Sequence, residues 1–501
     1  MSKLPTVFLF SALILILPIS NTYSQDHSAI SNGIRDIYSF RIIEAESFFN
    51  SFIKSNPNDP RGYYFLASLY LWKYLGNSKA DDFEKFIDLA DRSIAKCDKL
   101  IAEENTLADA LYFRGSMYGY KSIAYNKAEK YLEMIWASKN CTSDLNDALK
   151  INPGYYDAYL GLGLFKFALS QVPSTFKWAL NMIGFEGDLN QGLNYIRLAA
   201  TKGKWAKVEA QYYLAQILTD YFQSYKESDA LLKELSLKYP GNLLFQYSLA
   251  VTNMKKRELK TAEKTLKNII SKKNVNFDQI QSFSYFLLGD INFFRNNAET
   301  AIQFYNRFLL STTSKEYTGI ATYRMALCFE FMGDTVVADG YYDKIRKSNW
   351  SNEEDLYAFR KSVAFNRSRP SEDELNVIKY QNLLETEQYK VIADSLKDKY
   401  ESLKDGYVKG IASLTLSDAL YNLGKFEESL NYAILATQFN TSEERWIVPF
   451  GNYYAAKAIF KLGNKIKSYE FLEKAESAKD YDFINKLRPM LINFRNKFNE
   501  G

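Results

Sequence analysis

The chain has 501 residues, of which 47% are hydrophobic and 24% are charged. The 63 Lys and Arg residues nearly balance the 59 Asp and Glu residues, and a net charge of +4 excludes the strongly basic face of a nucleic-acid-binding protein. With 38 Tyr and 35 Phe but only 10 Pro, the composition favours long packed elements over loops. We therefore expect a large folded protein with no nucleic-acid partner.

Residues 1–24 resemble a secretory signal peptide. Lys3 supplies a basic start, an apolar run extends to Leu17, and the small residues Thr22 and Ser24 suit a cleavage site that would leave Gln25 first. An uncleaved membrane anchor is the alternative, although the apolar run is short for a bilayer span. We expect export to the bacterial periplasm or association with the outer membrane, with cleavage near Ser24 and no integral span afterwards.

Few residues are suited to catalysis. The single histidine is His27, which excludes histidine-based triads and metal sites. Cys97, Cys141 and Cys328 cannot all pair, and we interpret them as packing residues, with one disulfide left open. No phosphate-binding glycine loop or metal-binding loop is present. We expect no enzyme, no cofactor, no metal and no catalytic residue; a buried, closely spaced Asp/Glu pair in a deep pocket would reopen the question.

The first part of the chain shows apolar residues at helical spacing. The spacing predicts helices at 60–75, 82–103, 106–125, 155–170 and 189–201, and Asp188 with Gln191 three residues later suits an N-terminal cap. A proline stands ten residues before a small residue at three places, which puts it in the turn that precedes a new helix. These pairs are Pro57 with Ala67, Pro153 with Gly163 and Pro240 with Ala250.

Beyond residue 206 a repeat becomes clear. Small residues lie 12 positions apart in paired amphipathic segments, as expected where two antiparallel helices approach closely across a short turn. The pairs are Ala250 with Ala262, Gly289 with Ala301, Ala326 with Ala338, Ser417 with Ser429 and Ala456 with Ser468. The second-helix positions Ser228, Ala262, Ala301, Ala338, Ile392, Ser429 and Ser468 follow in steps of 34, 39, 37, 54, 37 and 39.

This pattern resembles the tetratricopeptide repeat (TPR) family. In the clearest repeat, Tyr285, Leu288, Gly289, Ala301 and Tyr305 stand at the family's Trp, Leu, Gly, Ala and Phe positions. The resemblance implies an all-α fold of tandem helical hairpins, a TPR-like α-solenoid with a right-handed superhelix, and irregular N-terminal hairpins. The step of 54 predicts an insertion, and Ile392 departs from the small-residue rule.

Residues 159–205 are similar to a bacterial branch of repeat proteins related to the eukaryotic inclusion-body-clearance TPR proteins. The matching features are Gly161 and Gly163, Pro173, and "GFEGD" ahead of a "GL" helix. A membrane hairpin is the competing interpretation of the segment around Pro173, but polar residues interrupt it. The basic cluster "KGKWAK" from Lys202 is interpreted as a solvated helix start.

These observations predict five regions along the chain. They are a signal peptide at 1–24, an irregular TPR-like region at 25–205, a TPR array at 206–345, an insertion with an irregular hairpin at 346–405, and C-terminal hairpins at 406–501.

Aromatic residues recur three positions before, or four after, the small residue of the first helices, where a solenoid would place its concave side. They are Tyr64, Tyr112, Tyr247, Phe286, Phe293, Tyr323, Tyr421, Tyr453 and Phe460. Such a stripe could stack on a peptide or a sugar chain, or it could pack in the core. The sequence thus predicts an exported scaffold for protein or peptide partners, with a glycan- or peptide-binding module as the alternative.

Overall fold

The computed structural model describes residues 22–104, 107–172, 182, 184–272, 278–346, 350, 352–403, 406–439 and 442–500. The predicted signal peptide therefore lies almost wholly outside the described residues, with Thr22 at the start of the first helix. Pro173 and most of the segment considered as a membrane hairpin also lie outside them.

All regular structure in the described ranges is α-helical. The helices are α1 (Thr22–Tyr38), α2 (Ile42–Ser55), α3 (Pro60–Asn77), α4 (Ala80–Ala102), α5 (Leu107–Lys127), α6 (Tyr131–Ile151), α7 (Ala158–Ser170), α9 (Leu189–Lys202), α10 (Lys207–Asp220), α11 (Tyr225–Lys238), α12 (Leu243–Lys255), α13 (Leu259–Ile270), α14 (Asp278–Phe294), α15 (Ala298–Ser311), α16 (Thr318–Met332), α17 (Thr335–Arg346), α18 (Glu353–Arg367), α19 (Glu372–Glu385), α20 (Tyr389–Tyr400), α21 (Gly406–Asn422), α22 (Phe426–Ala436), α23 (Ile447–Lys461), α24 (Lys465–Ser477) and α25 (Ile484–Glu500).

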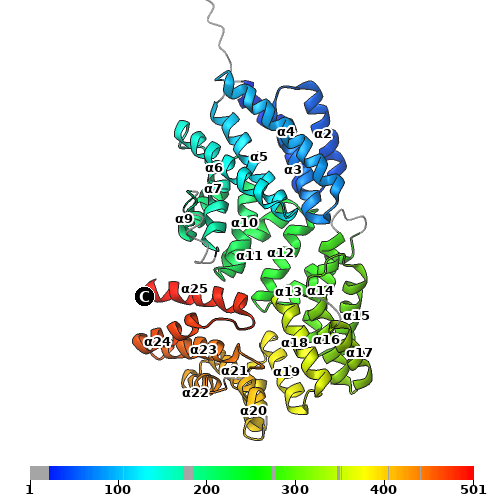
Figure 1. Cartoon of the computed structure of the whole chain (residues 1–501), viewed down its shortest axis with the longest axis vertical. Helices are drawn as coiled ribbons and strands as arrows, with labels where there is room; N and C mark the ends of the chain where they lie inside the picture. The colour runs from blue at the N-terminus through cyan, green and yellow to red at the C-terminus, as the bar shows by residue number, and fades with distance from the viewer. Residues whose placement is uncertain are drawn as a thin grey trace, which may run out of the picture.

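The helices stack as successive hairpins, and the predicted all-α solenoid is confirmed. In Figure 1 the chain begins with the blue helices at the top, passes through the green helices in the middle and on the right, and ends with orange and red helices at the lower left. The last helix, α25, returns toward the middle of the molecule, where the Asn493 side-chain amide donates to Gln223, beside the start of α11, at 3.4 Å.

The small residues lie where the two helices of each hairpin touch. Every Ala and Ser of the five predicted pairs has no exposed surface. Ser417 and Ser429 each donate their hydroxyl to the other's carbonyl, at 2.9 and 2.8 Å, so α21 and α22 are joined by a reciprocal pair of hydrogen bonds. A Cβ at Gly289 would stand 2.5 Å from the Tyr305 ring, which explains the glycine at that position.

The turn inside each hairpin repeats in conformation as well as in position. One residue per turn has a positive φ between 52° and 88°, the left-handed conformation that ends many helices. These residues are Gln223, Arg257, Asn296, Gly333, Glu387, Gly424 and Gly463. Their spacings are 34, 39, 37, 54, 37 and 39, the same steps as those of the second-helix positions, so the backbone confirms the repeat boundaries independently.

The described residues of the N-terminal part form the five predicted helices and three more. Asp188 caps α9 as predicted by accepting the Gln191 amide at 2.9 Å. Helices α1, α2 and α6 were not predicted. Helix α6 is inconspicuous in sequence because its buried face is formed mostly by small residues, Ala137, Cys141 and Ala148, whereas Leu132 is 82% exposed.

The predicted insertion at 346–405 contains a complete extra helix, α18. It packs on the preceding hairpin through Ala358 and Phe365, which belong to the same core cluster as Tyr323 and Ala338. Its Asp355 accepts the amides of Tyr317 and Ile320 at 2.8 and 2.7 Å and so caps the start of α16. Helices α19 and α20 then form the hairpin that contains Ile392, and Ile392 is fully buried.

The three cysteines are unpaired and buried in different helices, α4, α6 and α16. Burial raises the pKa of both Cys141 and Cys328 to about 12. They act as core residues, and the disulfide that the sequence left open is not formed.

Candidate functional site

Six of the nine aromatic residues of the predicted stripe are buried. Tyr64, Tyr112, Phe286, Phe293, Tyr323 and Tyr453 are each between 1% and 6% exposed. A ring without exposed faces cannot stack on a ligand. The prediction of a concave binding stripe is therefore wrong for these six residues, and the packing interpretation holds for them.

Their neighbours show why they are buried. Tyr323 lies between the rings of Tyr357 and Phe365, with centroids 6.3 and 6.1 Å away, so the extra helix α18 covers it. Phe286 packs against Phe308 and Tyr317, both at 5.3 Å. An aromatic residue on a first helix is thus covered by the next helices in the stack, which sequence spacing alone does not reveal.

Tyr247, Tyr421 and Phe460 are only partly buried. The Phe460 ring lies 5.6 Å from Phe494 and 5.1 Å from Phe498, so α25 packs over it. Tyr421 instead lies beneath an ammonium group, that of Lys457, at 4.1 Å from the ring centroid.

Lys457 lies among three tyrosines on α21 and α23. Its ammonium nitrogen is 4.1 Å from the Tyr421 ring, 5.4 Å from Tyr453 and 5.5 Å from Tyr454. Burial lowers the pKa of Lys457, and the negative charge of Asp418 opposes that shift. The rings replace part of the lost hydration of the cation by cation–π attraction. The chain's own lysine therefore occupies the aromatic cluster that the sequence offered as a ligand surface.

Arg257 joins distant parts of the stack. From the α12–α13 turn it donates to the Tyr389 hydroxyl at 2.8 Å and to Asp418 at 3.2 Å, and it lies 3.6 Å from Glu385. Asp418 is 161 positions away in sequence. This residue holds the middle of the solenoid against its C-terminal hairpins.

Glu209, on α10, is a buried carboxyl group surrounded by tyrosines. It is 4% exposed and accepts the Tyr120 hydroxyl at 2.7 Å. Burial raises the pKa of Glu209, and the hydrogen bond from Tyr120 opposes the shift only partly. Burial, and secondly the charge of Glu209, raises the pKa of Tyr38, Tyr64 and Tyr120, which lie on three other helices. No sequence spacing marks this cluster, because its members come from four separate helices.

A second buried cluster contains two carboxylates and one lysine. The Lys361 ammonium group lies 2.8 Å from Glu374 and 2.9 Å from Glu444, and all three side chains are at most 7% exposed. The Tyr407 hydroxyl donates to Glu374 at 2.8 Å, and the Trp446 indole donates to Glu444. A buried carboxylate pair in a deep pocket would reopen the enzyme question, whereas the oxygens of these two carboxylates bind the lysine and the aromatic donors.

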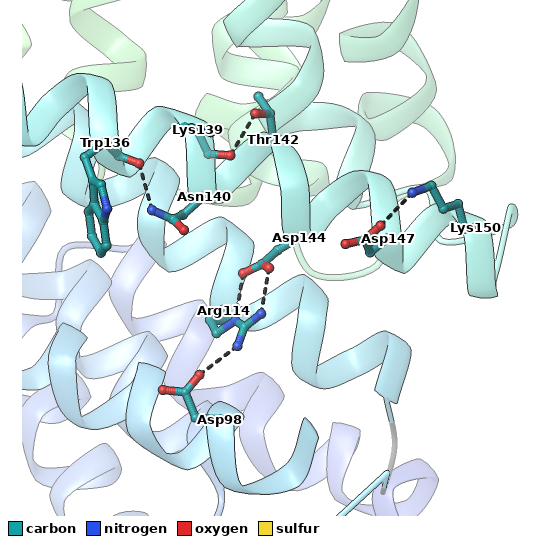
Figure 2. A network of polar contacts seen from close by, with 9 residues as sticks. All are labelled: Asp98, Arg114, Trp136, Lys139, Asn140, Thr142, Asp144, Asp147 and Lys150. Carbon is teal, nitrogen blue, oxygen red and sulfur yellow. Dashed lines mark hydrogen bonds and ion pairs between the residues drawn. The ribbon is translucent and has the colours of Figure 1, made fainter. Parts of the chain in front are cut away.

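Charged residues on other hairpins are paired in the same way. Figure 2 shows Arg114 on α5 reaching Asp144 on α6 with two nitrogens, at 2.7 and 2.8 Å, and Asp98 on α4 at 2.7 Å. One side chain thus ties three consecutive helices together, because a guanidinium group can donate in several directions.

The described residues bring together no group of three His, Cys, Asp or Glu side chains that could hold a metal ion. None of the described helices combines the length and apolarity needed to cross a bilayer. The polar clusters around Glu209, Lys361 and Arg114 join helices to one another.

Comparison with known proteins places this architecture. A family model described as Iml2/Tetratricopeptide repeat protein 39 matches residues 124–379, about half of the chain. The chain belongs to the Iml2/Tetratricopeptide repeat protein 39 family. The match includes residues 159–205, and the resemblance to TPR proteins of this kind is confirmed.

Solved structures that match most of the chain share little sequence with it. Yeast Tom70 is 12% identical, with 95% of this chain and 96% of that chain covered and a TM-score of 0.21. The P58(IPK) TPR domain is 11% identical, with 91% and 100% covered and a TM-score of 0.22. Naa15/Naa10 bound to HypK-THB is 13% identical, with 97% and 81% covered and a TM-score of 0.26. The family assignment rests on the family model alone.

Proposed function

We propose that the chain is an exported scaffold that holds protein partners together in the bacterial periplasm or at the outer membrane and has no enzymatic activity of its own. The main support is that the chain belongs to a TPR family and is built of stacked helical hairpins, which present an extended surface for contacts. Its buried charged groups pair with one another. The signal-like residues 1–24 support export.

The location is tested by sequencing the N-terminus of the chain purified from its native cell. We expect Gln25 as the first residue and recovery in the envelope fraction. Replacing Ser24 by tyrosine should block processing because the position before the cleaved bond needs a small side chain. Recovery of an unprocessed chain in the cytosol would refute export without touching the scaffold function.

The scaffold function is tested by crosslinking in the native cell, followed by identification of the attached proteins. We expect the same few proteins in repeated experiments, enriched over those attached to an exported protein of similar size. Absence of any enriched protein would refute the proposal. Stacking of a glycan or peptide on the predicted stripe is not proposed, because six of its rings are buried.

A further inference from the structure

A cavity of about 260 Å³ lies at one edge of the N-terminal stack. It is lined by the first turns of α3 and α5 and by the segments that precede α7 and α10. Its walls are Arg61, Asp109, Phe113, Asn152, Gly154, Tyr155, Tyr156, Asp157, Lys202, Lys204 and Trp205. None of the clusters described above uses this space.

Two lysines stand at the cavity. The Lys202 ammonium group lies 4.8 Å from the centroid of the Tyr156 ring, and that of Lys204 lies 4.9 Å from Trp205. Both side chains are exposed, and neither forms an ion pair with a carboxylate of the described residues. The aromatic faces hold the lysines in place while their positive charges stay available.

The acidic groups of the cavity are already engaged. One oxygen of Asp157 accepts the backbone amides of Lys204, Trp205 and Ala206 at 2.7 to 2.8 Å. Asp109 accepts the Tyr155 hydroxyl at 2.6 Å. One oxygen of each carboxylate is therefore engaged inside the protein.

Arg61 is 2% exposed, and its guanidinium group forks onto Asp59, with the closest contact at 2.6 Å. Arg61, Lys202 and Lys204 thus formally balance the three aspartates. The starts of α7 and α10 are matched by the ends of α6 and α9, at Ile151 and Lys202, so the helix dipoles largely cancel in these turns. The exposed ammonium groups of Lys202 and Lys204 are the charges that a ligand can reach, and they favour an anion with one charge.

Size and lining restrict the ligand further. The volume of about 260 Å³ lies just below the range of about 300–1,000 Å³ for pockets of drug-sized ligands and suits a group of about a dozen non-hydrogen atoms. Tyr155 and Tyr156 are half-buried and expose part of their rings, and Phe113 and Trp205 pack behind them with centroids 5.7 Å apart. A ligand with a planar or apolar body would be matched by this wall.

We propose that this cavity binds a carboxylate carried on a planar or apolar body the size of one amino-acid residue, with Lys202 and Lys204 holding the carboxylate. Such a group is found on a free organic acid and at the carboxyl terminus of a protein chain. The site does not depend on the scaffold function, since a small acid can bind it in the absence of any protein partner.

The probe is benzoate, and binding to the full chain is measured by ligand-observed NMR. We expect a dissociation constant in the millimolar range for benzoate, with benzyl alcohol and benzylammonium binding at least tenfold more weakly. The double variant Lys202→Ala/Lys204→Ala should weaken benzoate binding at least fivefold. The backbone amide of Lys204 still reaches Asp157 in this variant, so the turn keeps its support.

The matched control is Lys260→Ala/Lys264→Ala, which removes two exposed lysines from α13, outside the cavity, and changes the net charge equally. Benzoate binding should be unchanged in it. The proposal is overturned if benzoate does not saturate, if benzyl alcohol binds as well as benzoate, or if the two double variants behave alike.

Peptides ending in phenylalanine identify the source of the carboxylate. Tighter binding of the free-acid peptide than of both its amidated form and benzoate assigns the site to a protein terminus. Binding of benzoate with no preference for the free-acid peptide over the amide assigns it to a small organic acid. Either outcome requires the loss of binding in Lys202→Ala/Lys204→Ala.

Discussion

Replacing Lys361 by methionine should destabilise the C-terminal half of the chain strongly. Lys361 lies on the extra helix α18, Glu374 lies in the first turn of α19, and Glu444 lies just before α23, so one ammonium group holds three segments together. Methionine preserves most of the side-chain length and removes the charge. Two buried carboxylates would then face each other without a cation.

Removing one partner of a buried ion pair costs about 3–5 kcal/mol, because the remaining charge stays desolvated. The cost should depend on pH. Burial raises the pKa of Glu444 even in the presence of the lysine, and without it the carboxyl pKa rises further above the unfolded value of about 4.3. A raised carboxyl pKa means that stability is lost as pH rises, so the variant should be closer to the parent at pH 5 than at pH 8.

The assay is urea unfolding followed by tyrosine and tryptophan fluorescence at pH 5 and pH 8. The control is Lys390→Met on α20, an exposed lysine, which should change stability by less than about 0.5 kcal/mol. The triple variant Lys361→Met/Glu374→Gln/Glu444→Gln should recover most of the loss, because it removes the buried charges together. A Lys361→Met protein as stable as the control at pH 8 would refute the reasoning.

Three further predictions concern the packed stack. Glu209→Gln should raise the thermal midpoint at pH 8 more than at pH 5, because the buried acid, with its raised pKa, costs stability as pH rises; an equal effect at both pH values would contradict this. Gly424→Ala should lower the free energy of unfolding by about 1 kcal/mol, because the φ of Gly424 is 76°. Gly340→Ala should raise it by about 0.5–1 kcal/mol, because Gly340 lies inside α17 with open space around it. Changes of the urea midpoint in the same direction for the two variants would contradict this reasoning. Tyr323→Ala should lose about 3–5 kcal/mol in urea unfolding, and an unchanged midpoint would mean that the ring is not core.

The repeat could be predicted from sequence because it depends on local geometry. Two helices joined by a short turn need a small residue at each contact point, so the spacing of 12 between Ala326 and Ala338, or Ser417 and Ser429, is visible in the chain itself. Each hairpin turn also has one residue in the left-handed conformation, which is a glycine at Gly424 but a glutamate at Glu387. A search for glycine in the sequence would therefore not find the turn at Glu387.

The candidate site could not be predicted to the same degree. Spacing places Tyr323 on the inner face of a first helix, but it cannot show that α18 then covers the ring. Helix α6 escaped prediction because Leu132 and Trp136 are exposed and its buried side is formed largely of small residues. The cluster around Glu209 depends on residues from four helices, and a single sequence carries no record of which distant helices meet.

The three isolated cysteines make the chain its own reporter of partial opening. In the closed state each thiol is buried, and the raised pKa of Cys141 and Cys328 leaves almost no thiolate at neutral pH, so a labelling reagent reacts only after its hairpin separates. Helices in a stacked array contact mainly their neighbours, so the hairpins open with different free energies. Labelling rates at Cys97, Cys141 and Cys328 would therefore measure, without any introduced cysteine, how firmly the array is closed at α4, α6 and α16.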